Sequence, residues 1–178
     1  MCDRQDRSLL FVLVASAFAL VLALPAHSQA ADPIGKGKNI GIGLGDSTFT
    51  AGLTGKFYLN PPSAIQLFIG NYGHYYGRYA CVGCGIGIAG DYVYEFQDLV
   101  NESSGRLFLG AGGGAAFYTY GNRYYGGSSG LAINGVFELG WHFAEFPLEL
   151  VLDVRPAFSF GPFGAFWLDW GAAIRFFF

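Results

Sequence analysis

The chain has 178 residues, of which 52% are hydrophobic, 18% are aromatic and only 13% are charged. Soluble domains carry about 25% charged residues, so this composition is unusual for one. Twenty-eight glycines, eighteen phenylalanines and eleven tyrosines favour strands and tight turns over a helical bundle. A net charge of -3 gives no basic surface for nucleic acid, and the high apolar content excludes disorder.

The first thirty residues have the pattern of a secretory signal peptide. A weakly positive start comes before an uncharged apolar run at 9–24, and small residues follow at Ser28 and Ala30. We expect residues 1–30 to be removed, which leaves 31–178 as one domain. The alternative is an uncleaved membrane anchor, but the run is short for a helix that spans a bilayer.

Apolar and polar residues alternate along most of the remaining chain. Residues 131–143 place Asn134, Glu138 and His142 on one face and only apolar residues and glycine on the other. A period of two indicates a strand. The same pattern, weaker in the first five segments, predicts eight strands at 38–44, 53–59, 64–72, 85–96, 106–118, 131–143, 148–158 and 166–178.

Strand length favours an all-β, eight-stranded antiparallel transmembrane barrel. A tilted strand needs about 9 to 11 residues to cross a bilayer, whereas strands of soluble proteins average about 5 to 6. We expect short periplasmic turns at 60–63 and 144–147 and longer external loops at 71–84 and 121–129. The turn at 97–104 is expected to be long although it lies on the periplasmic side.

The charged residues indicate which face of the barrel is inside. Each strand offers too few charges to solvate an outer wall, and the charges of the two signs share one face. An eight-stranded interior is filled by side chains, so we expect a salt-bridged core rather than a water channel. The predicted lumen charge cluster is Lys56, Asp91, Glu95, Arg106, Glu138, Glu149, Asp153, Arg155, Asp169 and Arg175.

The C-terminus carries the most specific pattern. The last strand ends on an aromatic residue and is apolar at every second position before it. This pattern resembles the terminal signature by which barrel-assembly machinery recognises outer-membrane barrels. The predicted assembly signal is Trp170, Ile174, Phe176 and Phe178.

With this signature, the segments 43–46, 52–59 and 144–150 resemble the small eight-stranded outer-membrane proteins of the OmpA-barrel and OmpX type. They are also similar to an uncharacterised family of such barrels. The resemblance covers 31–178 and implies the fold and a bacterial outer-membrane location. It implies no active site.

Two glycine-rich segments match dinucleotide-binding patterns by letter, at 85–90 and 110–115. Neither is followed by a predicted helix whose N-terminus could hold a pyrophosphate. Glycines that relieve crowding in curved strands explain both segments better. We therefore expect no cofactor.

The predicted loop at 71–84 contains Cys81 and Cys84, which we expect to form a disulfide in an exported protein. A catalytic redox pair needs an electropositive setting, and only Arg78 is near. A zinc site would need two further ligands, for which His74 is the one nearby candidate.

His142 is the candidate base for a lipid-modifying enzyme, an activity that some eight-stranded barrels perform with a histidine, a serine and a carboxylate. Glu138, on the same face of the strand, lies about 13 Å away at about 3.3 Å per residue. That separation exceeds hydrogen-bond reach, and no serine is adjacent. We therefore expect no enzymatic activity.

The two predicted external loops share Tyr, Gly and Arg residues. An aromatic girdle at the lipid headgroups accounts for Tyr72, Tyr118 and Tyr120. The loop tips fit either a girdle or a binding surface, because Tyr and Arg recur at binding hot spots. The candidate binding residues are Tyr75, Tyr76, Arg78, Tyr79, Arg123, Tyr124 and Tyr125.

The predicted function is that of a monomeric outer-membrane barrel with a structural or surface-binding role. The expected partners are outer-membrane lipid, lipopolysaccharide, the assembly machinery and an extracellular ligand. The alternatives are a narrow ion or small-solute channel and a lipid-modifying enzyme.

Overall fold

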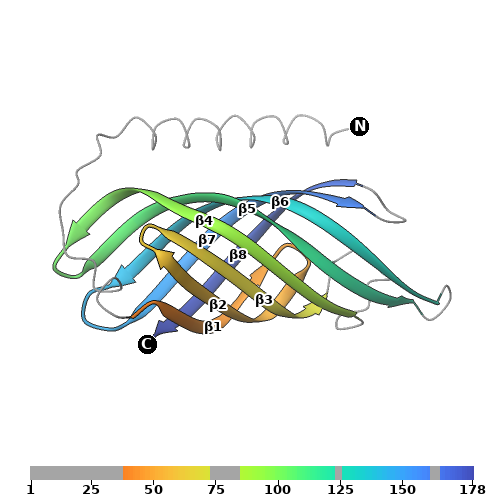
Figure 1. Ribbon diagram of the computed structural model, residues 1–178, viewed down its shortest axis with the longest axis horizontal. Coiled ribbons are helices and arrows are strands. Elements are labelled where there is room, and N and C mark those ends of the chain that lie inside the picture. The colour runs from red at the N-terminus through yellow and green to blue at the C-terminus, as the bar shows by residue number, and fades with distance from the viewer. Residues whose placement is uncertain (1–37, 73–84, 123–125, 161–164) are drawn as a thin grey trace, which may run out of the picture.

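The computed structural model describes residues 38–72, 85–122, 126–160 and 165–178. These residues form eight antiparallel strands, and the last pairs with the first to close a barrel (Figure 1). The expected all-β, closed, eight-stranded antiparallel barrel is confirmed. The strands are β1 (Ile40–Ser47), β2 (Thr50–Asn60), β3 (Ser63–Tyr72), β4 (Gly85–Glu102), β5 (Gly105–Asn122), β6 (Gly126–Phe143), β7 (Leu148–Phe160) and β8 (Ala165–Phe177).

In the part of the chain that the structure describes, no helix is long and apolar enough to cross a membrane. The predicted signal segment, residues 1–30, lies outside the described residues.

The two ends of the barrel differ. The start of β1, the end of β8 and the connections at 61–62, 103–104 and 144–147 lie at one end, which we call the turn end. The opposite end, the loop end, contains the tight turn between β1 and β2. In Figure 1 the turn end is on the left, and the long strands β5 and β6 extend furthest towards the loop end on the right.

The prediction of a long turn at 97–104 is wrong. β4 and β5 meet at a turn of two residues, Ser103 and Ser104. The pairing of β4 with β5 shifts register twice between Glu95 and Val100. Each such bulge moves the following side chains to the other face of the sheet. The strand therefore continues although its period-two pattern is interrupted.

The loop expected at 121–129 is also shorter than predicted, because β5 runs to Asn122 and β6 begins at Gly126. The added pairs include Gly121 with Gly127 and Tyr120 with Ser128. A segment of glycines and serines shows no apolar alternation, but its backbone N–H and C=O groups can still form the hydrogen bonds between β5 and β6.

The two faces of the wall have opposite polarity. The outward side chains are mainly leucine, isoleucine and aromatic residues, such as Leu152 at 64% exposure and Ile42 at 53%. Lys56, Arg155 and Arg175 point inward and are 0% exposed. The barrel therefore has an apolar exterior and a charged interior, the reverse of a soluble barrel.

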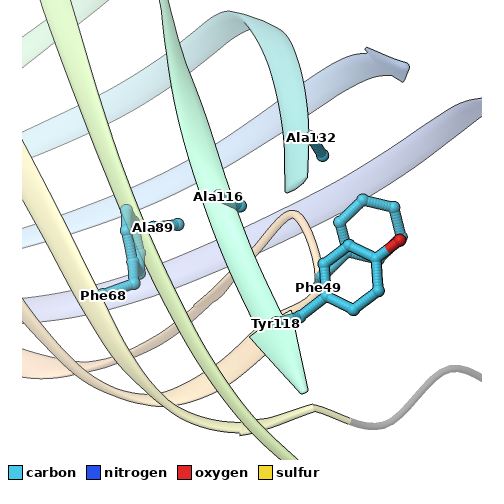
Figure 2. Close-up of a cluster of buried hydrophobic side chains, with 6 residues drawn as sticks. All are labelled: Phe49, Phe68, Ala89, Ala116, Tyr118 and Ala132. Atoms are coloured by element: carbon cyan, nitrogen blue, oxygen red, sulfur yellow. The ribbon is translucent and has the colours of Figure 1, made fainter. Parts of the chain in front are cut away.

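Aromatic side chains fill the lumen on either side of its charged residues. At the loop end, the β1–β2 turn folds inward, so that Phe49 is 5% exposed and its ring lies 4.7 Å from that of Tyr118 (Figure 2). Phe68 belongs to the same cluster. The prediction that Tyr118 belongs to an outer aromatic girdle is therefore wrong, because its ring is buried inside the barrel. At the turn end, Tyr58 and Phe177 pack together with a ring separation of 5.9 Å. The interior is a packed core over its described length.

Barrel closure depends on a close approach between β1 and β8. The two strands pair from Gly41 with Phe177 to Gly45 with Ala173. A Cβ atom added to Gly43 would overlap the backbone carbonyl oxygen of Ile174. Only glycine therefore lets the strands approach at this point.

We predict that Gly43→Val opens the seam between β1 and β8 and lowers stability by about 1–3 kcal/mol through overpacking. The measurement is the temperature at which the compact band of the unheated protein disappears on a gel run in detergent. Gly55→Val is the matched control, because a Cβ there meets only the ring of Phe57, at 3.2 Å. Equal melting of the two variants would contradict the proposed constraint.

Candidate functional site

A lysine ammonium lies at the centre of the charged lumen. Lys56 Nζ is 2.8 Å from Glu95 Oε1, 2.9 Å from Glu149 Oε2 and 3.4 Å from Glu138 Oε1. The four residues come from β2, β4, β7 and β6 and have at most 1% side-chain exposure. One cation thus bridges three carboxylates across the barrel.

Two arginines supply further positive charge. Arg175 Nη1 is 2.6 Å from Glu149 Oε1. Arg106 pairs with Glu95, and its Nε is 3.3 Å from Asp98 Oδ1. Three cations therefore face three buried glutamates, and we call these six residues the turn-end network: Lys56, Glu95, Arg106, Glu138, Glu149 and Arg175.

Gln66 hydrogen-bonds to both an anion and a cation of this network. Its Nε2 donates to Glu138 Oε2 at 2.6 Å, and its Oε1 accepts from Arg175 Nη2 at 2.8 Å. Gln66 is not among the lumen residues predicted from the sequence, because its side chain carries no charge. The available signal was its position between Ala64 and Phe68 on the inward face of β3.

A second group of polar residues lies nearer the loop end. Arg155 Nε and Nη2 donate to the two carboxylate oxygens of Asp153 at 2.7 and 3.0 Å. Its Nη1 donates to Asp91 Oδ2 at 2.5 Å and to Ser47 Oγ at 2.8 Å. Asn134 Nδ2 donates to Asp91 Oδ1 at 2.9 Å. Through Ser47, the last residue before the β1–β2 turn, this loop-end network joins β1 to β7 and β4.

Glycines make room for the acidic side chains of both networks. In three cross-strand pairs, a glycine lies directly opposite an acidic residue. A Cβ atom added to that glycine would overlap or crowd the carboxylate. These pairs are Glu138 with Gly110, Asp91 with Gly114, and Asp153 with Gly171.

Nine of the ten residues assigned to the lumen cluster from sequence are buried on the inside. The tenth, Asp169, lies opposite Arg155 on β8 but is only half-buried. Its Oδ1 accepts from the backbone N–H of Trp170 at 3.0 Å. Because β1 ends at Ser47, the wall beside this part of β8 is open on one side.

One group of side chains has the composition of a metal site. Glu95, His142 and Glu149 offer ligand atoms that all lie within 4.8 Å of one another. Lys56 Nζ occupies the space between the two glutamates at hydrogen-bond distance from both. A metal ion could bind only if this ammonium moved away, so the built-in cation fits the group better.

The surroundings of His142 do not match a catalytic base. Its Nε2 lies 2.6 Å from Glu149 Oε2 and 3.3 Å from Tyr58 Oη, and its Nδ1 has no hydrogen-bond partner among the described residues. In a catalytic triad the two ring nitrogens face different partners, the carboxylate and the nucleophile. Here both contacts use Nε2, and His142 is 0% exposed.

The carboxylate partner of His142 is not Glu138 on the same strand. It is Glu149, which lies directly opposite His142 on β7. A hairpin register derived from the turn at 144–147 could have shown this pair.

The remaining predicted residues lie on the outside or beyond the described segments. Trp170, Ile174, Phe176 and Phe178 point outward, with exposures of 57%, 45%, 45% and 63%. The proposed disulfide and the loop tips fall outside the described residues: Cys81, Cys84, Tyr75, Tyr76, Arg78, Tyr79, Arg123, Tyr124 and Tyr125.

The chain matches no protein-family model, no curated protein and no solved structure. The charged lumen is therefore interpreted from its own geometry. Its buried and balanced ion pairs are suited to holding the strands together.

We predict that Lys56→Met lowers the free energy of unfolding by about 3–5 kcal/mol, because it leaves buried carboxylates without their shared cation. Chemical denaturation in detergent micelles, followed by tryptophan fluorescence, measures the loss. Lys38→Met is the matched control, since Lys38 is exposed.

The double variant Lys56→Met/Glu138→Gln restores charge balance and should recover part of the lost stability. A double variant less stable than Lys56→Met alone would contradict the charge-balance explanation.

Proposed function

We propose that this protein is an integral barrel of a bacterial outer membrane, with a filled lumen and a structural or surface-binding role. The observation that carries the proposal is the reversed polarity of the wall. Of the lysines and arginines that the structure describes, only Lys38 is exposed, whereas large apolar side chains cover the outside. Such an exterior is suited to lipid and unsuited to water.

Strand length supports the same proposal. β2 to β8 have 10 to 18 residues each, and about 9 to 11 tilted residues cross a bilayer. Where β1 pairs with β8, the closed barrel also leaves no free sheet edge, as the hydrocarbon core requires. The predicted signal peptide and the terminal aromatic pattern favour the outer membrane and its assembly machinery.

The packed lumen argues against the alternative of a narrow channel. Both networks bridge opposite walls, and aromatic residues pack beyond each of them. An ion would have to break several buried ion pairs to pass, and each broken pair leaves a charge in a dry interior.

We predict that the unmodified protein gives no stable single-channel current after insertion into a planar lipid bilayer. The control is a well-characterised porin inserted under the same conditions, which should conduct. Reproducible current steps from this protein would support the channel alternative and overturn the filled-lumen proposal.

The surface-binding part of the proposal rests on the sequence of the external loops. A filled barrel inside lipid leaves its loops as the segments free to meet a partner, and loops on rigid scaffolds often carry function. Glycan, lipopolysaccharide and host protein are the candidate ligands. A lipid-modifying enzyme is the weaker candidate, because His142 is buried and both its contacts use one ring nitrogen.

We predict that replacing the tyrosines and arginines of both loop tips by serine leaves the barrel folded but abolishes ligand capture by whole cells. The positions are Tyr75, Tyr76, Arg78, Tyr79, Arg123, Tyr124 and Tyr125. Folding is checked by the compact band in detergent, and capture by adhesion to glycan- and protein-coated surfaces. Unchanged adhesion would assign these residues to membrane anchoring and the protein to a structural role.

A further inference from the structure

The outer wall carries an apolar groove of about 580 Å³ that extends over β5 to β8 and β1. Its lining side chains include Leu139, Leu150, Leu152 and Ile174, which are 40% to 64% exposed. Ala172, a small outward residue on β8, deepens it. The groove therefore opens to the outside of the barrel rather than to the charged lumen.

The groove follows a row of outward residues that are paired across neighbouring strands. With strands about 4.8 Å apart, five strands span about 19 Å. The row runs perpendicular to strands that are tilted by about 45°, so its two ends differ in height by about 14 Å along the barrel axis. This height is close to the thickness of one leaflet, since the hydrocarbon core is about 30 Å thick. The row consists of Leu107, Trp141, Leu150, Ile174 and Leu44.

A second hollow of about 530 Å³ adjoins the groove at the turn end. The two share Trp141 and Leu150 as walls, so one elongated molecule can reach both. Unlike the groove, the second hollow has two residues with polar side chains in its lining, Ser104 and Glu145, beside Phe143 and Phe146. An apolar chain beside a small polar region is the shape of a lipid.

The charge at the turn end indicates which headgroup fits. Glu145 and Glu102 are exposed there. The described arginines are all buried in the lumen, and the exposed Lys38 precedes β1, which does not line the second hollow. An anionic headgroup would be repelled by Glu145, whereas a primary ammonium could pair with it and hydrogen-bond to Ser104.

We propose that this groove binds a zwitterionic glycerophospholipid with a primary ammonium headgroup. One acyl chain lies along the groove past Ala172, and the ammonium pairs with Glu145. The inference rests on the proposed membrane location and adds to it a preferred lipid and its site.

The test uses Trp141 as a reporter. The chain has three tryptophans, so Trp167→Phe/Trp170→Phe leaves Trp141 alone. The protein is placed in phosphatidylcholine vesicles containing increasing fractions of phosphatidylethanolamine or phosphatidylglycerol with brominated acyl chains, which quench nearby tryptophan. We expect Trp141 to report about threefold preferential binding of the ethanolamine lipid, the magnitude of an exposed ion pair.

Two variants and one control locate the effect. Glu145→Gln should return the preference to about one, and Ala172→Leu should reduce quenching by filling the groove. The control, Trp141→Phe/Trp167→Phe, leaves Trp170 as the reporter, which lines neither hollow but is the next outward residue to Ala172 on β8. Because Trp170 lies further from Glu145, the preference for the ethanolamine lipid should be smaller there than at Trp141.

A preference for phosphatidylglycerol at Trp141, or a preference that survives Glu145→Gln, would overturn the lipid proposal. Equal quenching of Trp141 by the two brominated lipids would also overturn it but would leave the membrane location intact. If no brominated lipid quenches either reporter, the barrel is not in the bilayer, and the proposed function fails together with the inference.

Discussion

The contact between the Lys56 ammonium and three buried glutamates is the constraint around which the barrel is organised. A buried charge without a partner costs several kcal/mol, so these side chains must meet at one point. They come from β2, β4, β6 and β7, so their meeting fixes the register of strands far apart in sequence. Arg155 performs the same role nearer the loop end, where it joins β4, β7 and β1.

The glycine content follows from the same constraint. A narrow lumen can hold a long inward side chain only if the position opposite it is small. The carboxylates of Asp91, Glu138 and Asp153 each face a glycine, and the ring of Phe108 lies against Gly140 in the same way. In the two segments that match nucleotide-binding patterns by letter, Gly110 and Gly114 are thus explained by packing against lumen carboxylates, and Gly87 by the close approach of the Phe49 backbone.

Because the lumen is filled, a partner can reach only the outer surfaces of the barrel. The ion pairs of the interior hold the strands of the wall together. The charged groups of the two networks are buried. Under the proposed function, the external loops and the outer wall are the surfaces on which a partner can act. The wall is not uniform, because an apolar groove at Ala172 adjoins a second hollow whose lining includes Ser104 and Glu145. Surface chemistry rather than lumen chemistry therefore defines the proposed roles.

The sequence by itself determined the number of strands, the inward face of each and the residues Lys56, Glu95, Arg155 and Arg175 as lumen charges, because the side-chain period of a strand is a local property. The tertiary structure decided which charges meet. His142 with Glu149 and Gln66 with Arg175 join different strands, so their contacts depend on register and on barrel closure. The bulges between Glu95 and Val100 and the half-buried position of Asp169 also depend on neighbouring strands. Alternation within one segment carries no information about its neighbour's length, which is the physical reason that only the folded barrel fixed these features.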